Sequence, residues 1–237
     1  MATYLNVDVR GAVVSVEIAR PPGNLFTLEM CRQLTGVLRS PPPGTRALLL
    51  TAAGPAFCLG RERGARLPAE VHAMTSALAE LNAAVVSSSL AVVAQVSGDA
   101  AGYGVGLAAL ADVTLAAETA RFWFPEAEAG LSPALVLTWL PALLGRRLAF
   151  WLTATGLPLS AAEAERAGLI NRAVPPDALP AAAADAVGVL LRQPAEVCGE
   201  IKRDLAAFSA PGLGEAADRA VDRLTLRSLL MDGRARP

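Results

Sequence analysis

The 237-residue sequence predicts an α/β domain on three observations. Apolar residues alternate in segments 5–9 and 14–18, which is the pattern of a β-hairpin with one buried face. The apolar runs at 47–51 and 90–96 are continuous, as in strands that are buried on both faces of a sheet. Segments with helical periodicity follow most of these strands, and from residue 177 onward the apolar residues show helical periodicity only.

The other elements begin and end at local signals. Thr27 can cap the helix that follows it. Ser160 and Glu163 form a capping box at the start of another helix, which Gly168 can end. We expect helices at about 28–38, 70–86, 107–110, 135–144 and 147–153, and extended segments at about 113–116, 121–124 and 169–174.

Composition narrows the class of protein. Hydrophobic residues make up 53% of the chain and the formal net charge is −1, so the chain is neither disordered nor a nucleic-acid binder by charge. Asp99 and Asp112 interrupt the apolar runs before they reach the length of a membrane span. Cys31, Cys58 and Cys198 lack the spacing of a zinc or disulfide framework. We expect a cytoplasmic protein with no metal and with neither a membrane nor a nucleic acid as partner.

Two glycine-containing turns follow buried strands and can present backbone N–H groups to a ligand. They are Phe57-Cys58-Leu59-Gly60 and Gly102-Tyr103-Gly104. Two N–H groups that converge on one carbonyl oxygen form an oxyanion hole, and the loss of one donor typically costs about 2.7–4 kcal/mol of barrier. Each turn taken alone is also consistent with a tight connection that has no chemical role.

Glu126 is the candidate acid or base. It follows Pro125 at a strand end, and neighbouring aromatic side chains can remove it from water, which raises the pKa of a carboxyl group towards the range useful for proton transfer. The alternative is an ordinary solvated glutamate in a loop. Glu128 lies two residues further on as an exposed counterpart.

Four segments together resemble the crotonase (enoyl-CoA hydratase/isomerase) superfamily, in its order and at its spacing, from about residue 5 to about residue 210. The segments are Ala56-Phe57-Cys58-Leu59-Gly60, Val96-Ser97-Gly98 through Gly102-Tyr103-Gly104-Val105-Gly106, Ala120-Arg121-Phe122 with Pro125-Glu126, and Ala167-Gly168-Leu169-Ile170-Asn171. The resemblance implies a spiral of repeated ββα units over residues 1–176. It also implies a helical region at 177–237 that builds homotrimers or hexamers.

The resemblance also implies a site for an acyl thioester. The thioester oxygen is expected between the backbone N–H groups of Leu59 and Tyr103, and Glu126 is expected to move a proton at Cα. No cofactor is implied beyond the coenzyme A of the substrate. The residues expected to contact that substrate are Cys58, Gly60, Gly102, Gly104 and Arg61.

One position departs from the family pattern. The second carboxylate of the family falls on Gly106, and Asp99 is the candidate to replace it, although a turn aspartate commonly bonds its own backbone. Hydration uses two carboxylates, whereas one suffices to move a double bond. We therefore expect an isomerase, with hydration close behind. A decarboxylase or lyase, and a scaffold without catalysis, are the alternatives.

The sequence does not determine whether the acyl group is carried by coenzyme A or by a carrier protein. Near Pro22-Gly23-Asn24 only Arg20 supplies a positive charge. Arg61, Arg63 and Arg66 can meet the phosphates of coenzyme A, or they can form a solvated basic loop. The substrate is therefore either an acyl-CoA or an acyl group on a carrier protein.

Overall fold

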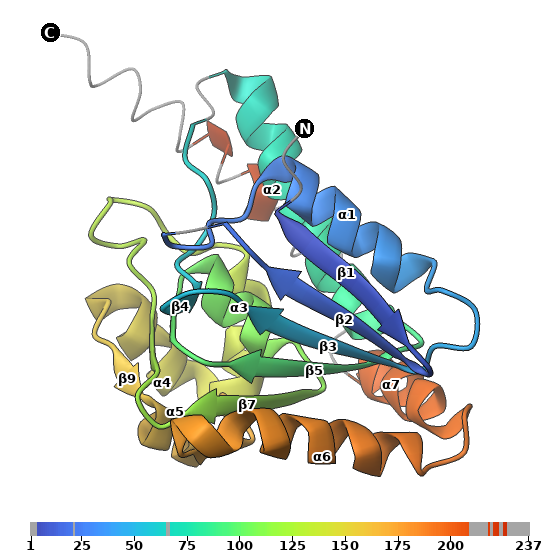
Figure 1. Cartoon of the computed structure of the whole chain (residues 1–237). Coiled ribbons are helices and arrows are strands. Elements are labelled where there is room, and N and C mark those ends of the chain that lie inside the picture. The colour runs from blue at the N-terminus through green and yellow to red at the C-terminus, as the bar shows by residue number, and fades with distance from the viewer. Residues whose placement is uncertain are drawn as a thin grey trace, which may run out of the picture.

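The computed structural model describes residues 4–20, 22–64 and 67–208, together with residues 218, 220–222, 225 and 226. The strands form two sheets, and Figure 1 shows strands β1, β2, β3, β5 and β7 of the larger one side by side. The six-stranded sheet has the order β1-β2-β3-β5-β7-β10, with β1 Leu5–Arg10, β2 Val13–Ile18, β3 Ala47–Ala52, β5 Ala91–Val96, β7 Val113–Ala117 and β10 Arg172–Val174. The four-stranded sheet has the order β4-β6-β8-β9, with β4 Ala56–Cys58, β6 Asp99–Ala101, β8 Arg121–Trp123 and β9 Leu159–Ser160.

The predicted hairpin is confirmed. Strands β1 and β2 pair antiparallel with Leu5 opposite Ile18, and the alternate residues Val14, Val16 and Ile18 are fully buried. The other pairings of the six-stranded sheet are parallel. Parallel strands need crossovers, and these carry the helices.

The helices cover both faces of the larger sheet. They are α1 Leu28–Arg39, α2 Pro68–Ser87, α3 Tyr103–Ala109, α4 Leu140–Thr155, α5 Ala161–Ala167, α6 Leu179–Leu191 and α7 Val197–Phe208, with short 3-10 helices at Val136–Thr138 and Pro176–Ala178. Helix α6 runs alongside the strands (Figure 1), and its residues Leu179, Ala183 and Val187 pack on outward-facing residues of β3, β5 and β7. The opposite face contributes to the main core, which also includes residues of α1 and α2.

This architecture confirms the predicted α/β class, and the structure adds details that the sequence pattern missed. The sequence predicts a loop at residues 56–58 and a turn at residues 99–101, but these segments pair as short parallel strands. Helix α3 begins at Tyr103, four residues before the predicted start, because Gly102 ends β6 with a φ of 51°. The predicted capping box at Ser160 and the end of α5 at Gly168 are both present. The role of residues 177–237 in subunit contacts stays a prediction.

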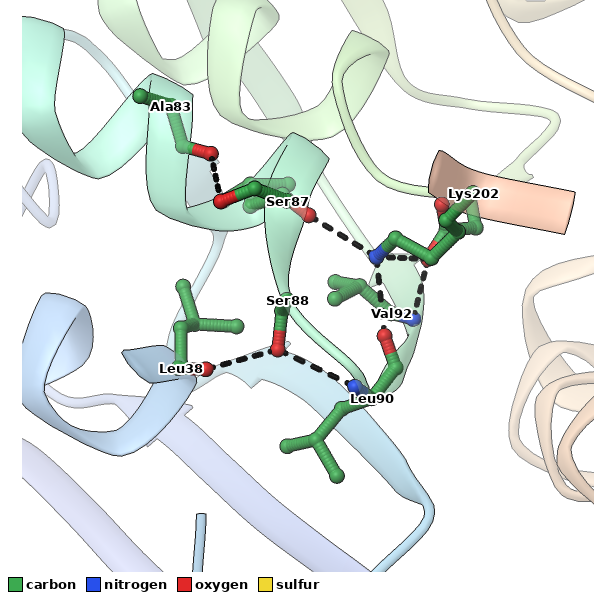
Figure 2. A network of polar contacts seen from close by, with 9 residues as sticks. Leu38, Ala83, Ser87, Ser88, Leu90, Val92 and Lys202 are labelled. Atoms are coloured by element: carbon green, nitrogen blue, oxygen red, sulfur yellow. Dashed lines mark hydrogen bonds and ion pairs between the residues drawn. The ribbon is translucent and has the colours of Figure 1, made fainter. Parts of the chain in front are cut away.

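A buried lysine joins α7 to the body of the domain (Figure 2). The Lys202 ammonium donates to the carbonyl oxygens of Val85 and Leu90 at 3.0 and 2.9 Å, and to the Asp112 carboxylate at 2.7 Å. That carboxylate also accepts the backbone N–H of Val92 at 2.7 Å. All three donor positions of the ammonium are therefore used, and each contact lies about 90 residues or more away in sequence.

Candidate active site

The two predicted turns lie side by side at the ends of β4 and β6. These strands pair parallel, with Cys58 opposite Ala100. The first turn of α3 is so close to β4 that a Cβ at Gly104 would lie 2.0 Å from the carbonyl oxygen of Cys58. Gly104 is therefore a position of close backbone approach, and Gly104 does not line the cavity described below.

Replacing Gly104 with alanine is expected to lower the free energy of unfolding by about 1–3 kcal/mol, because the backbone must shift to admit the methyl group. Denaturant titration measures this loss. The matched control is Gly36→Ala in helix α1, where the new methyl group would meet nothing within 4 Å apart from its chain neighbours and the helix's own backbone, and a stabilisation of about 0.4–1 kcal/mol is expected. Equal changes in the free energy of unfolding in Gly104→Ala and Gly36→Ala would contradict the close approach of Gly104 to the backbone of Cys58.

The prediction that the Leu59 N–H binds the substrate oxygen is wrong. That N–H donates to the carbonyl oxygen of Gly23 at 2.8 Å. Asn24, buried and with a φ of 52°, holds this loop in place through its side-chain amide, which donates to the carbonyl oxygens of Ala53 and Ala56 at 2.9 and 2.7 Å. The sequence could not reveal this acceptor, because Gly23 lies 36 residues before Leu59.

The N–H of Arg61 is available in its place. Phe26 and Arg61 form a parallel bridge in which the Phe26 N–H donates to Gly60 and the Glu62 N–H donates to Phe26. Backbone groups alternate in direction along a strand, so the Arg61 N–H faces away from Phe26. No backbone hydrogen bond in the described part of the chain uses it.

Tyr103 has the second candidate N–H group. It is the first residue of α3, where backbone N–H groups have no partner inside the helix. Among the hydrogen bonds of the described residues, none uses the Tyr103 N–H. The tyrosine ring packs against Phe26, with 5.6 Å between the ring centroids, and its hydroxyl group is buried.

Glu126 lies directly against the glycine turn. A Cβ at Gly102 would be 2.7 Å from its Oε1 atom. The Gly102 N–H donates to the carbonyl oxygen of Trp123 at 2.9 Å, and the N–H groups of Ala129 and Leu131 donate to the Glu126 carbonyl oxygen. These bonds fix the backbone of Glu126, while its Oε2 atom is buried with no hydrogen-bond partner among the described residues.

Burial raises the pKa of Glu126 above its ordinary value. A hydrogen bond from its own backbone N–H and the positive charges of Arg63 and Arg61 lower the pKa in part. A carboxylate that is removed from water but kept beside positive charges is suited to accept a proton and to return it.

Arg61, Tyr103 and Glu126 line one cavity of about 240 Å³. Its walls are mainly apolar side chains. The lining residues are Leu25, Leu59, Gly60, Arg61, Arg63, Leu78, Gly102, Tyr103, Pro125, Glu126, Leu131, Pro133, Ala134, Leu135 and Val136. Of the residues expected to contact substrate, the structure therefore brings Gly60, Arg61 and Gly102 together with Leu59, Tyr103 and Glu126.

Two other site predictions are wrong. The Asp99 carboxylate accepts the backbone N–H of Arg121 at 3.0 Å and pairs with the guanidinium of that residue at 2.7 Å, so it lies outside the cavity lining. Cys58 is fully buried, its thiol donates to the Gly60 carbonyl oxygen at 3.3 Å, and burial raises its pKa to about 12. Cys58 does not line the cavity, so its side chain packs in the core and does not contact a substrate there.

Comparison with known proteins identifies the family. The model of the enoyl-CoA hydratase/isomerase family matches residues 8–226. The chain belongs to this family. It is 36% identical to a probable enoyl-CoA hydratase of Rhodobacter capsulatus over 72% of this chain and 68% of that protein. It is 31% identical to the 1,2-epoxyphenylacetyl-CoA isomerase of Escherichia coli K12 over 96% of this chain and 92% of that protein.

Solved structures of this enoyl-CoA hydratase/isomerase family have the same fold. An enoyl-CoA hydratase from Mycobacterium avium subsp. paratuberculosis superposes with a TM-score of 0.87 over 99% of both chains, at 26% identity. Some other curated relatives match over only about half of their length. No described helix is long and apolar enough to cross a membrane. Within the described ranges, no three His, Cys, Asp or Glu side chains gather as metal ligands.

An indole ring lies where the second family carboxylate is expected. A Cβ at Gly106 would lie 3.4 Å from Cζ2 of Trp139, so a longer side chain there would meet the ring. Trp139 is buried, and its N–H has no partner among the described residues. The sequence gives no local signal for this contact, since Trp139 lies 33 residues after Gly106.

Proposed function

We propose that this enzyme shifts the double bond of an enoyl thioester from the 3,4 to the 2,3 position through an enolate. The thioester oxygen accepts hydrogen bonds from the backbone N–H groups of Tyr103 and Arg61. Glu126 removes a proton from Cα, the electron pair moves onto the oxygen, and the enolate forms. The same carboxyl group then returns the proton to Cγ, which regenerates the ionised carboxylate and leaves the double bond between Cα and Cβ.

The observation that carries the proposal is the half-buried carboxylate of Glu126, whose Oε2 atom has no hydrogen-bond partner among the described residues. Glu126 lines the same cavity as Arg61 and Tyr103, whose backbone N–H groups make no hydrogen bond within the described ranges. Backbone N–H groups stabilise an oxyanion without titrating, and a dry cavity strengthens them. No cofactor enters the scheme apart from the coenzyme A of the substrate. An acyl group on a carrier protein would meet the same groups.

Hydration is the second candidate, because several relatives carry the name enoyl-CoA hydratase. Two features favour isomerisation over hydration here. Gly106 offers no carboxylate to hold or deprotonate a water molecule, and Trp139 fills the space beside it.

Incubation of the purified enzyme with 3-hexenoyl-CoA and with 2-hexenoyl-CoA tests this proposal, with products followed by mass spectrometry and by the absorbance of the conjugated thioester. We expect the 3-enoyl compound to become conjugated without a change in mass. Addition of water to the 2-enoyl compound is expected to be slower than conjugation of the 3-enoyl compound by about 10²-fold or more. This factor of about 10² is the typical contribution of one acid or base. A gain of one water at a comparable rate would establish hydration instead, and no reaction of either compound would contradict both.

A further inference from the structure

Two arginine side chains face the cavity that holds Glu126. Arg61 is half-buried and Arg63 lies exposed at the rim, and both line the cavity. Burial lowers the pKa of the Arg61 guanidinium, the charge of Arg63 lowers it further, and the charge of Glu126 opposes this shift. Arg61, Arg63 and Glu126 therefore line one cavity whose other walls are mainly apolar.

The one acidic residue in this loop is engaged elsewhere. The Glu62 carboxylate pairs with the guanidinium of Arg20, which also donates to the carbonyl oxygen of Leu25 at 2.9 Å. Among the described residues, the Arg61 guanidinium makes one hydrogen bond, of 3.3 Å to the Glu62 carbonyl oxygen. Neither Arg61 nor Arg63 forms an ion pair with any residue in the described part of the chain.

The cavity therefore has an excess of positive charge. Two guanidinium groups face one carboxylate, and neither guanidinium pairs with it at ion-pair distance. The Arg61 charge is partly removed from water, which is unfavourable without a partner, and a bound anion would compensate for it. Arginine is also suited to hold a carboxylate by two parallel hydrogen bonds.

We propose that the substrate is an acyl thioester whose acyl group carries a carboxylate, and that the side chains of Arg61 and Arg63 bind this carboxylate. The inference rests on the proposed function, because it places the thioester between the N–H groups and Glu126. The phosphates of coenzyme A are the other source of an anion. The pantetheine arm holds them far from the thioester, whereas Arg61 and Arg63 line the same cavity as Glu126.

The test compares thioesters of one chain length. Calorimetry measures the binding of three CoA thioesters, which are glutaryl-CoA, its monomethyl ester and pentanoyl-CoA. It also measures the binding of the glutaryl and pentanoyl thioesters of N-acetylcysteamine, which lack phosphates. We expect glutaryl thioesters to bind at least about tenfold more tightly than the two neutral acyl groups on either thiol, the factor of one charge-assisted hydrogen bond. In Arg61→Gln and Arg63→Gln this ratio should fall towards one. Arg10→Gln, which removes an exposed arginine at the β1–β2 turn, should retain it.

Different results separate the possible failures. Equal binding of glutaryl and pentanoyl thioesters by the unaltered enzyme would overturn the inference. The two variants could instead bind every CoA thioester more weakly and bind the N-acetylcysteamine thioesters with unchanged affinity. That result would show that the arginines bind the phosphates, and it would also overturn the inference. Exchange of Cα hydrogen for deuterium in pentanoyl-CoA, measured in parallel, reports on the proposed function alone. Its absence would reject that function, whichever acyl group binds more tightly.

Discussion

Replacing Glu126 with glutamine is expected to slow the exchange of Cα hydrogen for deuterium in a bound acyl thioester by about 10²–10⁴-fold. Glutamine has nearly the same shape but cannot accept the proton, so the fold and the binding of the thioester should be retained. Mass spectrometry of the thioester after incubation in D₂O measures the exchange. The matched control is Glu128→Gln, because Glu128 is exposed and does not line the cavity. Exchange at an unchanged rate in Glu126→Gln would remove Glu126 from the mechanism.

The same assay has a predictable dependence on pH. The ionised form of Glu126 accepts the proton, and burial raises the pKa of this group above its ordinary value. The exchange rate should therefore fall as the pH decreases through that raised pKa, at a higher pH than an exposed glutamate would give. A rate that stays constant down to the ordinary pKa of a glutamate would contradict the burial of the carboxylate.

Replacing Lys202 with methionine is expected to lower the free energy of unfolding by about 3–5 kcal/mol, because the change leaves the partly buried Asp112 carboxylate without its counter-charge. The carbonyl oxygens of Val85 and Leu90 also lose their donor. For a domain whose total stability is typically about 5–15 kcal/mol, this is a large fraction. Denaturant titration of the purified variant measures the loss.

Two further variants separate the charge effect from a general effect on helix α7. Arg203→Met changes the next residue, which is exposed, and should cost no more than about 0.5 kcal/mol. Adding Asp112→Asn to Lys202→Met should recover part of the lost stability, because the unpaired charge is then removed. Equal losses in Arg203→Met and Lys202→Met, or no recovery in the double variant, would contradict this role of the ion pair.

The sequence by itself determined the elements whose causes are local. The hairpin follows from the alternation of Val14, Val16 and Ile18, and helix α5 follows from the capping box at Ser160 and the glycine at 168. The position of Glu126 after a proline at a strand end was likewise readable. These features need only neighbours within a few residues, so a single segment is enough to predict them.

The tertiary structure alone decided which backbone groups are free and which charges are paired. The Leu59 N–H donates to the Gly23 carbonyl oxygen, whereas the Arg61 N–H makes no backbone hydrogen bond among the described residues. The Asp99 carboxylate is paired with the guanidinium of Arg121. Trp139 fills the space beside Gly106. Each partner lies more than 20 residues away in sequence, because hydrogen bonds and packing depend on distance in space. Whether a backbone group is free can therefore be read only from the folded chain.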